Sequence, residues 1–289
     1  AELDTLPVPT QRLTINAIPL DTNNAGQLTS LQRLASQAQR EILLNGIAGI
    51  KTLPPMPNAA RLVLTKLGLT DLSSVTPSAF PVLNDISLTT LPDIDGSELG
   101  PIRNMAKIGL SGMAGLAGSN PLAGLTGGTF NTILMQQSPN ITTLADLTSV
   151  TTLRGLTIVG LDGLTNLDGL QNLTTVSSFL NFSRNLNLQN FDALANLASL
   201  GESLTVDSNK AIQNLDGLRG IAGSLQTVSI LLNDQLTDIS GLSGITGASK
   251  SVFAYGNAIT ECDVLVQSRL NPAPTGSEYY VVPACVYST

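Results

Sequence analysis

Apolar residues in the second half of the chain recur with a fixed period of 24 residues. Triplets with an apolar first and third residue begin at Leu156, Leu180, Leu204, Val228 and Val252. Such alternation predicts a short strand that directs its first and third side chains into a core. A constant period of about 20 to 29 residues is typical of a solenoid, in which each turn is stable only when stacked on its neighbours. The pattern therefore predicts similar turns that share a parallel β-sheet.

The same register continues towards the N-terminus with less regular spacing. Further triplets begin at Thr132, Ile108, Ile86 and Leu62, and the interval from Ile86 to Ile108 is two residues shorter than 24. Nine turns result, which at about 4.8 Å per strand predict a sheet about 43 Å long. Apolar residues after each strand come at every third position, which suits tight, 3₁₀-like turns that point one side chain inward at each corner.

Before these turns, apolar residues recur at the spacing of an amphipathic helix. Thr29 or Ser30 can cap its start, and Asn45-Gly46 is expected to end it. A strand is possible at 13–15. The helix would cover the apolar end and bare strand edge of the first turn. Its apolar positions are Leu28, Leu31, Leu34, Ala38 and Ile42.

The pattern divides the chain into three parts. Residues 1–60 hold an extended segment and the capping helix, 61–260 hold the solenoid, and 261–289 lie outside the repeat. Cys262 and Cys285 flank this last segment, and a disulfide between them would contribute about 3 kcal/mol by closing its loop. We therefore expect a C-terminal cap closed by a disulfide, with a reactive thiol pair as the alternative.

Two columns of polar residues keep the same period. A buried Asn in a turn can bond the backbone of its own turn and of the next, so an Asn five residues after each strand start predicts a structural ladder. Its members are Asn185, Asn209, Asn233 and Asn257. Twelve residues after each strand start stand residues that favour helix N-caps, which predicts one short helical turn per repeat. They are Ser74, Asn120, Asp168, Asp192, Asp216 and Ser240.

The best-preserved turns, from Leu156 to Asn257, read L-x-I-x-x-N-x-x-L-x-x-L. This pattern resembles the leucine-rich repeat, in particular the variety of receptor L domains and of secreted bacterial and algal repeat proteins. The resemblance implies a strand-dominated solenoid of the α/β leucine-rich-repeat type that binds ligands on its strand face. It implies no catalytic apparatus, since the family shares none, and fold alone does not fix function.

The outward positions of the predicted strands are the candidate ligand-binding face. They lie one and three residues past each strand start. In the first four turns they are Val63, Thr65, Ser87, Thr89, Gly109, Ser111, Ile133 and Met135. In the last five they are Thr157, Val159, Asn181, Ser183, Thr205, Asp207, Ser229, Leu231, Phe253 and Tyr255. Only Asp207 among them is charged, which favours either a neutral surface fitted to a partner or a protein of generally low charge.

Composition narrows the class of protein. Apolar residues make up 42% of the chain and charged residues 12%, which argues against intrinsic disorder. The net charge of −7 argues against nucleic-acid binding, which needs clustered Lys and Arg. No apolar run is long enough to span a membrane.

The chain contains no His, which excludes Ser-His-Asp and Cys-His catalytic devices and His-ligated metals. The Gly-rich stretch 112–128 lacks the Lys-Ser/Thr of a P-loop. Asp168, Asp192 and Asp216 would stack about 5 Å apart on neighbouring turns, which leaves a glycosidase carboxylate pair or a calcium site conceivable. Since Ser and Asn share their column, we predict no enzyme, no cofactor and no metal.

Several features favour a secreted or cell-surface protein, including one of the extracellular matrix. The two cysteines suit an oxidising compartment. Three sequons predict glycosylation at Asn140, Asn172 and Asn181. The chain begins at Ala1 without an apolar leader, as a processed secretory product would.

Three hypotheses of function follow. The first is extracellular recognition or a matrix role, in which a protein or glycan binds the strand face or the end caps, with Phe253 and Tyr255 as aromatic anchors. The second is ice binding by the file Thr157, Asn181, Thr205 and Ser229. The third is a structural subunit of an extracellular filament or wall.

Overall fold

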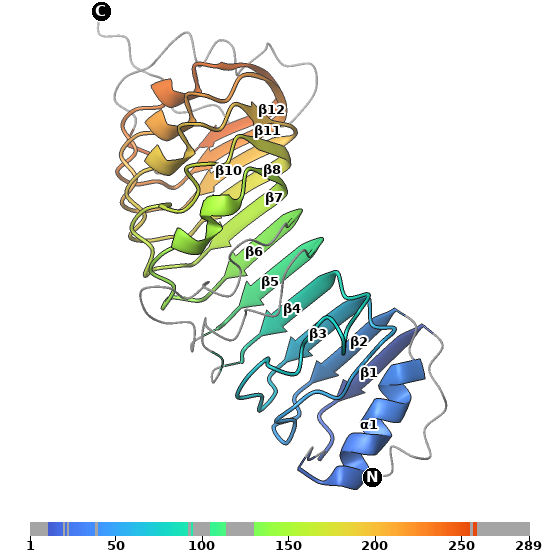
Figure 1. Ribbon diagram of the computed structural model, residues 1–289. Helices are drawn as coiled ribbons and strands as arrows, with labels where there is room; N and C mark the ends of the chain where they lie inside the picture. The colour runs from blue at the N-terminus through green and yellow to red at the C-terminus, as the bar shows by residue number, and fades with distance from the viewer. Residues whose placement is uncertain are drawn as a thin grey trace, which may run out of the picture. The chain divides into compact units, whose positions relative to one another are not determined.

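The computed structural model describes residues 11–19, 21, 23–37, 40–91, 94, 105–113, 130–254 and 257–258. Of residues 249–254 the backbone alone is described. The chain divides into unit 1, residues 1–140, and unit 2, residues 141–289 (Figure 1). Among the described residues, no helix is long and apolar enough to cross a membrane.

Unit 1 is built on parallel strands that pair in chain order (Figure 1). Each has five residues, and its second and fourth side chains are buried because the chain alternates apolar and polar positions. The strands are β1 (Arg12–Asn16), β2 (Glu41–Asn45), β3 (Arg61–Thr65), β4 (Asp85–Thr89), β5 (Lys107–Ser111) and β6 (Thr132–Gln136). The strand column thus begins before residue 61, with β1 and β2.

The helix α1 (Ala25–Gln37) is shorter than the sequence predicts. Its cap is Asn24, whose side-chain oxygen accepts bonds from the N–H groups of Gly26 and Gln27, at 3.0 and 3.3 Å. The prediction of Thr29 or Ser30 as cap is wrong, since both hydroxyls donate to carbonyls one turn earlier in the helix. Ile42 lies in β2, because the alternation of Ile42 and Leu44 suits a strand better than a continued helix.

The register of β6 differs by one residue from the prediction. Ile108 pairs with Ile133, so the interval is 25 residues, and Ile133 and Met135 are buried while Thr132 and Leu134 point outward. The prediction of Ile133 and Met135 as surface residues is therefore wrong. A one-residue shift moves every side chain of a strand to the other face, and this shift buries the two larger apolar side chains.

Unit 2 continues the 24-residue register. Leu156, Leu180, Leu204 and Val228 are in-register partners on neighbouring strands, and all are fully buried. The strands are β7 (Thr152–Val159), β8 (Thr175–Ser183), β9 (Ser199–Leu200), β10 (Ser203–Asp207), β11 (Gly223–Leu231) and β12 (Ile245–Ala254). All are parallel, and β8 pairs with β7, β9 and β10. The prediction of a strand-dominated parallel solenoid is confirmed.

The last strand departs from the predicted period. Val228 pairs with Ser251 rather than Val252, and Phe253 pairs with Ile230. The irregularity in this pair lies at Gly223–Ser224, where the partner positions shift by one. The prediction that Phe253 shares the outward column of Ser229 is therefore wrong in register, because an odd shift exchanges the two faces of a strand.

Short 3₁₀ helices form the opposite side of the turns in unit 2 (Figure 1). They are η4 (Ala145–Ser149), η5 (Asp192–Leu194), η6 (Asp216–Leu218) and η7 (Ser240–Leu242). The predicted helical turns occur in these repeats, but Asp192, Asp216 and Ser240 do not cap them. They are the first helical residues, and the cap residues Phe191, Leu215 and Ile239 make no side-chain capping bond.

The polar residues two positions earlier organise these turns. Asn190 and Asn214 accept bonds from the N–H groups of Asp192 and Asp216, at 3.2 and 3.1 Å, and Asp238 accepts from Ser240 at 2.7 Å. These are Asx turns, in which the side chain replaces a backbone acceptor. The residue whose side chain forms the turn therefore lies ten residues past the predicted strand start, rather than twelve.

A buried asparagine ladder joins the turns of unit 2 just after the strands. Asn209 donates its side-chain amide to the carbonyl of Phe182 at 2.9 Å and to Oδ1 of Asn233 at 3.3 Å. Its own Oδ1 accepts from the backbone and the side chain of Asn185, both at 3.1 Å. Asn257 continues the column, since its Oδ1 accepts from the backbone N–H of Asn233 at 2.9 Å. The side chain of Asn209 thus bonds the turn before it and the turn after it.

Candidate functional site

The predicted binding residues of unit 2 form two files across β7, β8, β10 and β11. One file aligns Thr157, Asn181, Thr205 and Ser229, and the other aligns Val159, Ser183, Asp207 and Leu231. Thr157 and Ser183 are buried, with 7% and 8% exposure, and the other six side chains are half-buried. We call this surface, with the third file given next, the strand face of unit 2.

A third outward file lies one residue before each predicted strand start, and sequence reasoning missed it. It aligns Gly155, Phe179, Ser203 and Thr227. Phe179 is half-buried, and it directly precedes Leu180 in the sequence. Over five residues, the alternation gives each strand three outward positions, and the predicted triplet leaves out the first of them. Extending the alternation by one residue before each triplet could have identified this file. Asp207 is the only charged side chain of the three files.

Gly155 makes room for the ring of Phe179. A Cβ atom built on Gly155 would lie 2.3 Å from Cζ of Phe179 and 2.5 and 2.7 Å from its two Cε atoms. These nearly equal distances describe an approach to the face of the ring, because an edge-on approach would leave the Cε atoms much farther away than Cζ. The ring therefore lies flat over Gly155, above the sheet.

A bulge in β8 comes immediately before Phe179. Leu153 pairs with Val176 whereas Gly155 pairs with Phe179, so β8 has one more residue than β7 over this stretch. Bulges bend a strand and redirect the neighbouring side chain. The buried hydroxyl of Ser178, in the bulge, donates to the carboxylate of Glu202 at 2.7 Å. This bond links the bulge to the segment that leads into β10.

Polar contacts also order the strand face. Ser183 donates its hydroxyl to Oδ1 of Asn181 at 2.6 Å, and Ser208 donates to Oδ1 of Asp207 at 2.9 Å. The amide Nδ2 of Asn181 has no hydrogen-bond partner among the described residues. Asn181 can therefore offer a donor to a ligand while its oxygen stays engaged.

Unit 1 presents a different outward surface. Its middle file aligns Thr14, Leu43, Val63, Ser87, Gly109 and Leu134, and its last file aligns Asn16, Asn45, Thr65, Thr89, Ser111 and Gln136. Neither file contains a charged residue. The last file is a row of hydroxyls and amides across the whole sheet of unit 1.

The first file of unit 1 is a ladder of alternating charge that the sequence analysis did not identify. Arg12, Glu41, Arg61, Asp85 and Lys107 are successive partners in the sheet. Arg12 Nε lies 3.2 Å from Glu41, and Arg61 lies 2.8 Å from Glu41 and 3.4 Å from Asp85. Its three basic and two acidic residues alternate and leave a net charge of only +1, so the ladder orders the edge of the surface rather than attracting one sign of charge strongly.

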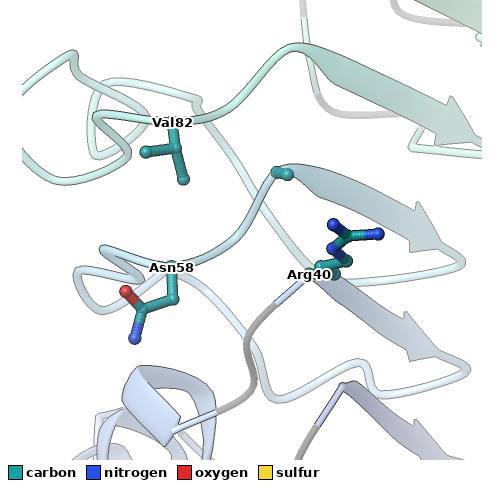
Figure 2. A pocket seen from close by; sticks show the side chains of 4 residues that line it. Arg40, Asn58 and Val82 are labelled. Atoms are coloured by element: carbon teal, nitrogen blue, oxygen red, sulfur yellow. The ribbon is translucent and has the colours of Figure 1, made fainter.

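A hollow of about 400 Å³ lies at the N-terminal ends of β2 and β3 (Figure 2). Arg40, Asn58, Ala60 and Val82 line it, and 49% of Val82 is exposed. Asn58 donates its amide to the carbonyl of Ser36 at 2.6 Å, which ties this edge to α1. The hollow is open, and Arg40 provides its one charged group.

The predicted sequons lie in different settings. Asn172 is exposed, and its amide nitrogen donates to the carbonyl of Thr148 at 2.8 Å. Asn140 is exposed in the turn after β6. Asn181 lies inside β8, on the strand face. Glycosylation at all three remains a prediction, and a glycan on Nδ2 of Asn181 would cover the strand face, so ligand binding by this face requires Asn181 to be unglycosylated.

The aspartate column lies on the 3₁₀ side of unit 2, away from the strand face. Asp168, Asp192 and Asp216 are exposed, and Asp216 forms an ion pair with Arg219. Within the described residues, no group of three His, Cys, Asp or Glu side chains is arranged to hold a metal ion. Cys262, Cys285 and Tyr255 lie outside the described residues, as do the predicted disulfide cap and the second aromatic anchor.

No family model matches this chain, and no curated protein matches it in sequence. Among solved structures, it is similar to an internalin (inlF) from Listeria monocytogenes, with 17% identity over 91% of this chain and 85% of that chain, at a TM-score of 0.48. Its own repeat period, parallel strands and buried asparagine ladder give the chain a leucine-rich-repeat-like solenoid fold.

Proposed function

We propose that this chain is a non-catalytic recognition protein whose strand face in unit 2 binds an extracellular protein or glycan. The observation that carries the proposal is the order of this face. Its outward side chains lie in three registered files, with one charge and one half-exposed aromatic ring among them. A surface that is ordered before binding loses little conformational entropy when a partner docks.

The chemistry of the face supports binding rather than catalysis. Hydroxyls and amides can hydrogen-bond a partner in many ways, whereas general acid–base or nucleophilic catalysis needs a paired base within reach. The chain has no His, and Asp207 is the single titratable side chain in the three files, so this face offers no paired acid and base. An extracellular setting agrees with the three sequons and the two cysteines.

Site-specific photocrosslinking tests this proposal. A benzophenone side chain placed at Ser229, on the strand face, is expected to capture a partner from the secreted and cell-surface fraction of the source. The same group at the exposed Ala195, just after η5 on the opposite side, is the matched control. Thr205→Arg, next to Ser229 in the sheet, should abolish capture because it adds bulk and charge to the face. Equal capture from both sites, or capture that Thr205→Arg leaves unchanged, would contradict the proposal.

Ice binding is a second candidate, which the last file of unit 1 favours. Asn16, Asn45, Thr65, Thr89, Ser111 and Gln136 are uncharged hydrogen-bonding residues at the regular spacing of parallel strands. The file of unit 2 that the sequence predicts to bind ice is interrupted by the burial of Thr157. Ice grown with micromolar protein would become faceted, and Thr65→Lys with Thr89→Lys would abolish the faceting. Unfaceted growth with the unsubstituted protein would exclude this candidate.

A further inference from the structure

Phe179 differs from the other phenylalanines whose side chains are described. Phe80, Phe130, Phe182 and Phe191 are at most 4% exposed, and Phe182 and Phe191 pack edge to face at 5.0 Å. Phe179 instead lies on the strand face, half-buried. A ring that is not used in the core and is held on an ordered surface needs an explanation of its own.

The geometry leaves one face of the ring available. The ring covers the position where a Cβ of Gly155 would point, so its inner face rests on the backbone of β7. Its outer face is directed away from the sheet. The cross-strand neighbour on the other side is Ser203, which has a small side chain. The result is a flat aromatic platform parallel to the strand face.

The groups around the platform select among ligands that stack on aromatic rings. A guanidinium would need a counter-charge when it loses water, and the neighbouring outward residues, Asn181, Ser203 and Thr205, supply none. The carboxylate of Glu202, one residue before Ser203, already accepts the hydroxyl of Ser178 at 2.7 Å. An aliphatic side chain would leave the free amide of Asn181 and the hydroxyl of Ser203 without partners, which is costly once they are covered. A ligand with an apolar C–H face and hydroxyls at its rim satisfies both requirements.

We propose that Phe179 is the stacking platform of a site for a neutral saccharide. This inference rests on the proposed function and gives the strand face its ligand class. The C–H face of a pyranose ring packs on the outer face of Phe179, Asn181 donates its free amide to one hydroxyl, and Ser203 and Thr205 bond neighbouring hydroxyls. The glycine at 155 is part of the site, because any side chain there would displace the ring.

The ring also has a structural role that the test must separate. An aromatic side chain over a strand glycine covers exposed backbone and stabilises the sheet. Phe179→Leu keeps apolar cover over Gly155 and removes the flat face. Phe179→Tyr keeps both. A purely structural role predicts that binding follows the stability of the variant, whereas a stacking role predicts that it follows the presence of a ring.

The test is titration of the full chain with a panel of neutral hexasaccharides, namely cellohexaose, maltohexaose, laminarihexaose, mannohexaose and chitohexaose. Binding is read from the backbone amide shifts of Gly155, Asn181 and Ser203, and unfolding by urea is measured in parallel. We expect at least one sugar to bind, Phe179→Leu to weaken it at least about tenfold, and Phe179→Tyr to preserve it. Leu186→Ala, which shortens an exposed apolar side chain outside the three files, is the matched control and should bind normally.

Failure of every hexasaccharide to shift these amides would overturn the proposal. So would equal affinity for the unsubstituted chain and Phe179→Leu. Either result leaves recognition by the strand face open to the crosslinking experiment, because a captured protein partner would sustain that function without a sugar. Absence of capture from Ser229 together with normal sugar binding at Phe179 would support the saccharide site and limit recognition by the strand face to glycans.

Discussion

Asn209 shows at the scale of one residue how the turns of unit 2 are held in register. Its side chain is fully buried, and its four hydrogen bonds reach two other asparagines and the carbonyl of Phe182. A buried donor or acceptor without a partner costs about 1–3 kcal/mol, so the ladder ties each turn to the next at a position where water cannot substitute.

Asn209→Ala should therefore lower the free energy of unfolding by about 3 kcal/mol or more, because it leaves the Phe182 carbonyl and the N–H of Asn185 without partners. Urea denaturation measures the loss. Asn196→Ala is the matched control, since Asn196 is exposed and makes one bond, to the carbonyl of Gln171 at 2.8 Å. It should cost about 1 kcal/mol or less. Equal losses would show that the ladder does not carry the stability assigned to it.

The residue that follows each strand from β1 to β11, apart from β9, adopts a left-handed backbone. Glycine occupies only three of these positions, Gly46, Gly112 and Gly160. The others are Ala17, Lys66, Thr90, Gln137, Arg184, Ser208 and Leu232. The conformation lets the residue donate its N–H to the next strand, as Thr90 does to Ser111 at 2.8 Å. The strain is greatest for the β-branched Thr90, with φ 52°.

Thr90→Gly is expected to be neutral or to stabilise unit 1 by up to about 1 kcal/mol, because relief of left-handed strain of about 1–2 kcal/mol exceeds the entropy cost of glycine. Thermal unfolding gives the sign. Thr89→Gly, one residue earlier inside β4, should destabilise instead, since φ is extended there and glycine weakens a strand. A clear loss of stability in Thr90→Gly would show that its side chain contributes more than its backbone costs.

At the scale of elements, the 3₁₀ turns stack so closely that they require small residues. A Cβ on Gly217, in η6, would lie 1.9 Å from the carbonyl oxygen of Phe191, and one on Gly241, in η7, would lie 1.9 Å from that of Leu215. Real Cβ atoms do not approach oxygen so closely. The spacing of these turns therefore depends on glycine at positions 217 and 241 as well as on the strands, whereas Ala193 holds the matching position of η5.

Gly217→Ala should destabilise unit 2 by about 2–4 kcal/mol, because η5 and η6 would have to separate. Gly223→Ala is the control, because it introduces backbone strain without this steric clash. Gly223 has φ 101° but nothing within 4 Å of a Cβ, so alanine there should cost only about 1–2 kcal/mol. Urea midpoints of the two variants make the comparison. A smaller effect at Gly217 would show that the turns adjust freely.

The charge ladder of unit 1 also acts between elements. Arg61 contacts carboxylates on both neighbouring strands while 44% of its side chain stays exposed, so each pair is worth only about 0.2–1 kcal/mol. Arg61→Glu would place three acidic residues in a row on β2, β3 and β4. We expect a loss of about 1–3 kcal/mol that shrinks in 1 M salt, where the screening length is about 3 Å. Arg61→Met, which removes the charge without reversing it, should lose about half as much, and salt-independent losses would contradict the electrostatic explanation.

At the scale of the whole molecule, the two cysteines and the sequons are the features on which the predicted extracellular location depends. If Cys262 and Cys285 are joined, dithiothreitol or Cys262→Ser with Cys285→Ser should lower stability by about 3 kcal/mol. Intact-mass measurement with and without reductant shows whether two hydrogens are missing before reduction. Free thiols in protein isolated from its source would contradict both the disulfide cap and the oxidising location.

Sequence periodicity alone located the inward-facing triplets of β7, β8, β10 and β11 and the side chains that fill the core there. This is possible because each strand repeats the same local alternation and each turn buries it in the same way. Leu156, Leu180, Leu204 and Val228 align for that reason. The prediction failed where local patterns were ambiguous, as at Ile42, which fits both a helical and a strand period.

Only the tertiary structure decided the features that depend on pairing between strands. The register of β6 and β12, the alternation of Arg61 with Glu41 and Asp85, and the position of Phe179 over Gly155 all depend on which residue lies opposite which. A one-residue slip or a bulge exchanges the inward and outward faces of a strand without changing the local sequence pattern. The surface residues can therefore be assigned only when the neighbouring strands have been placed.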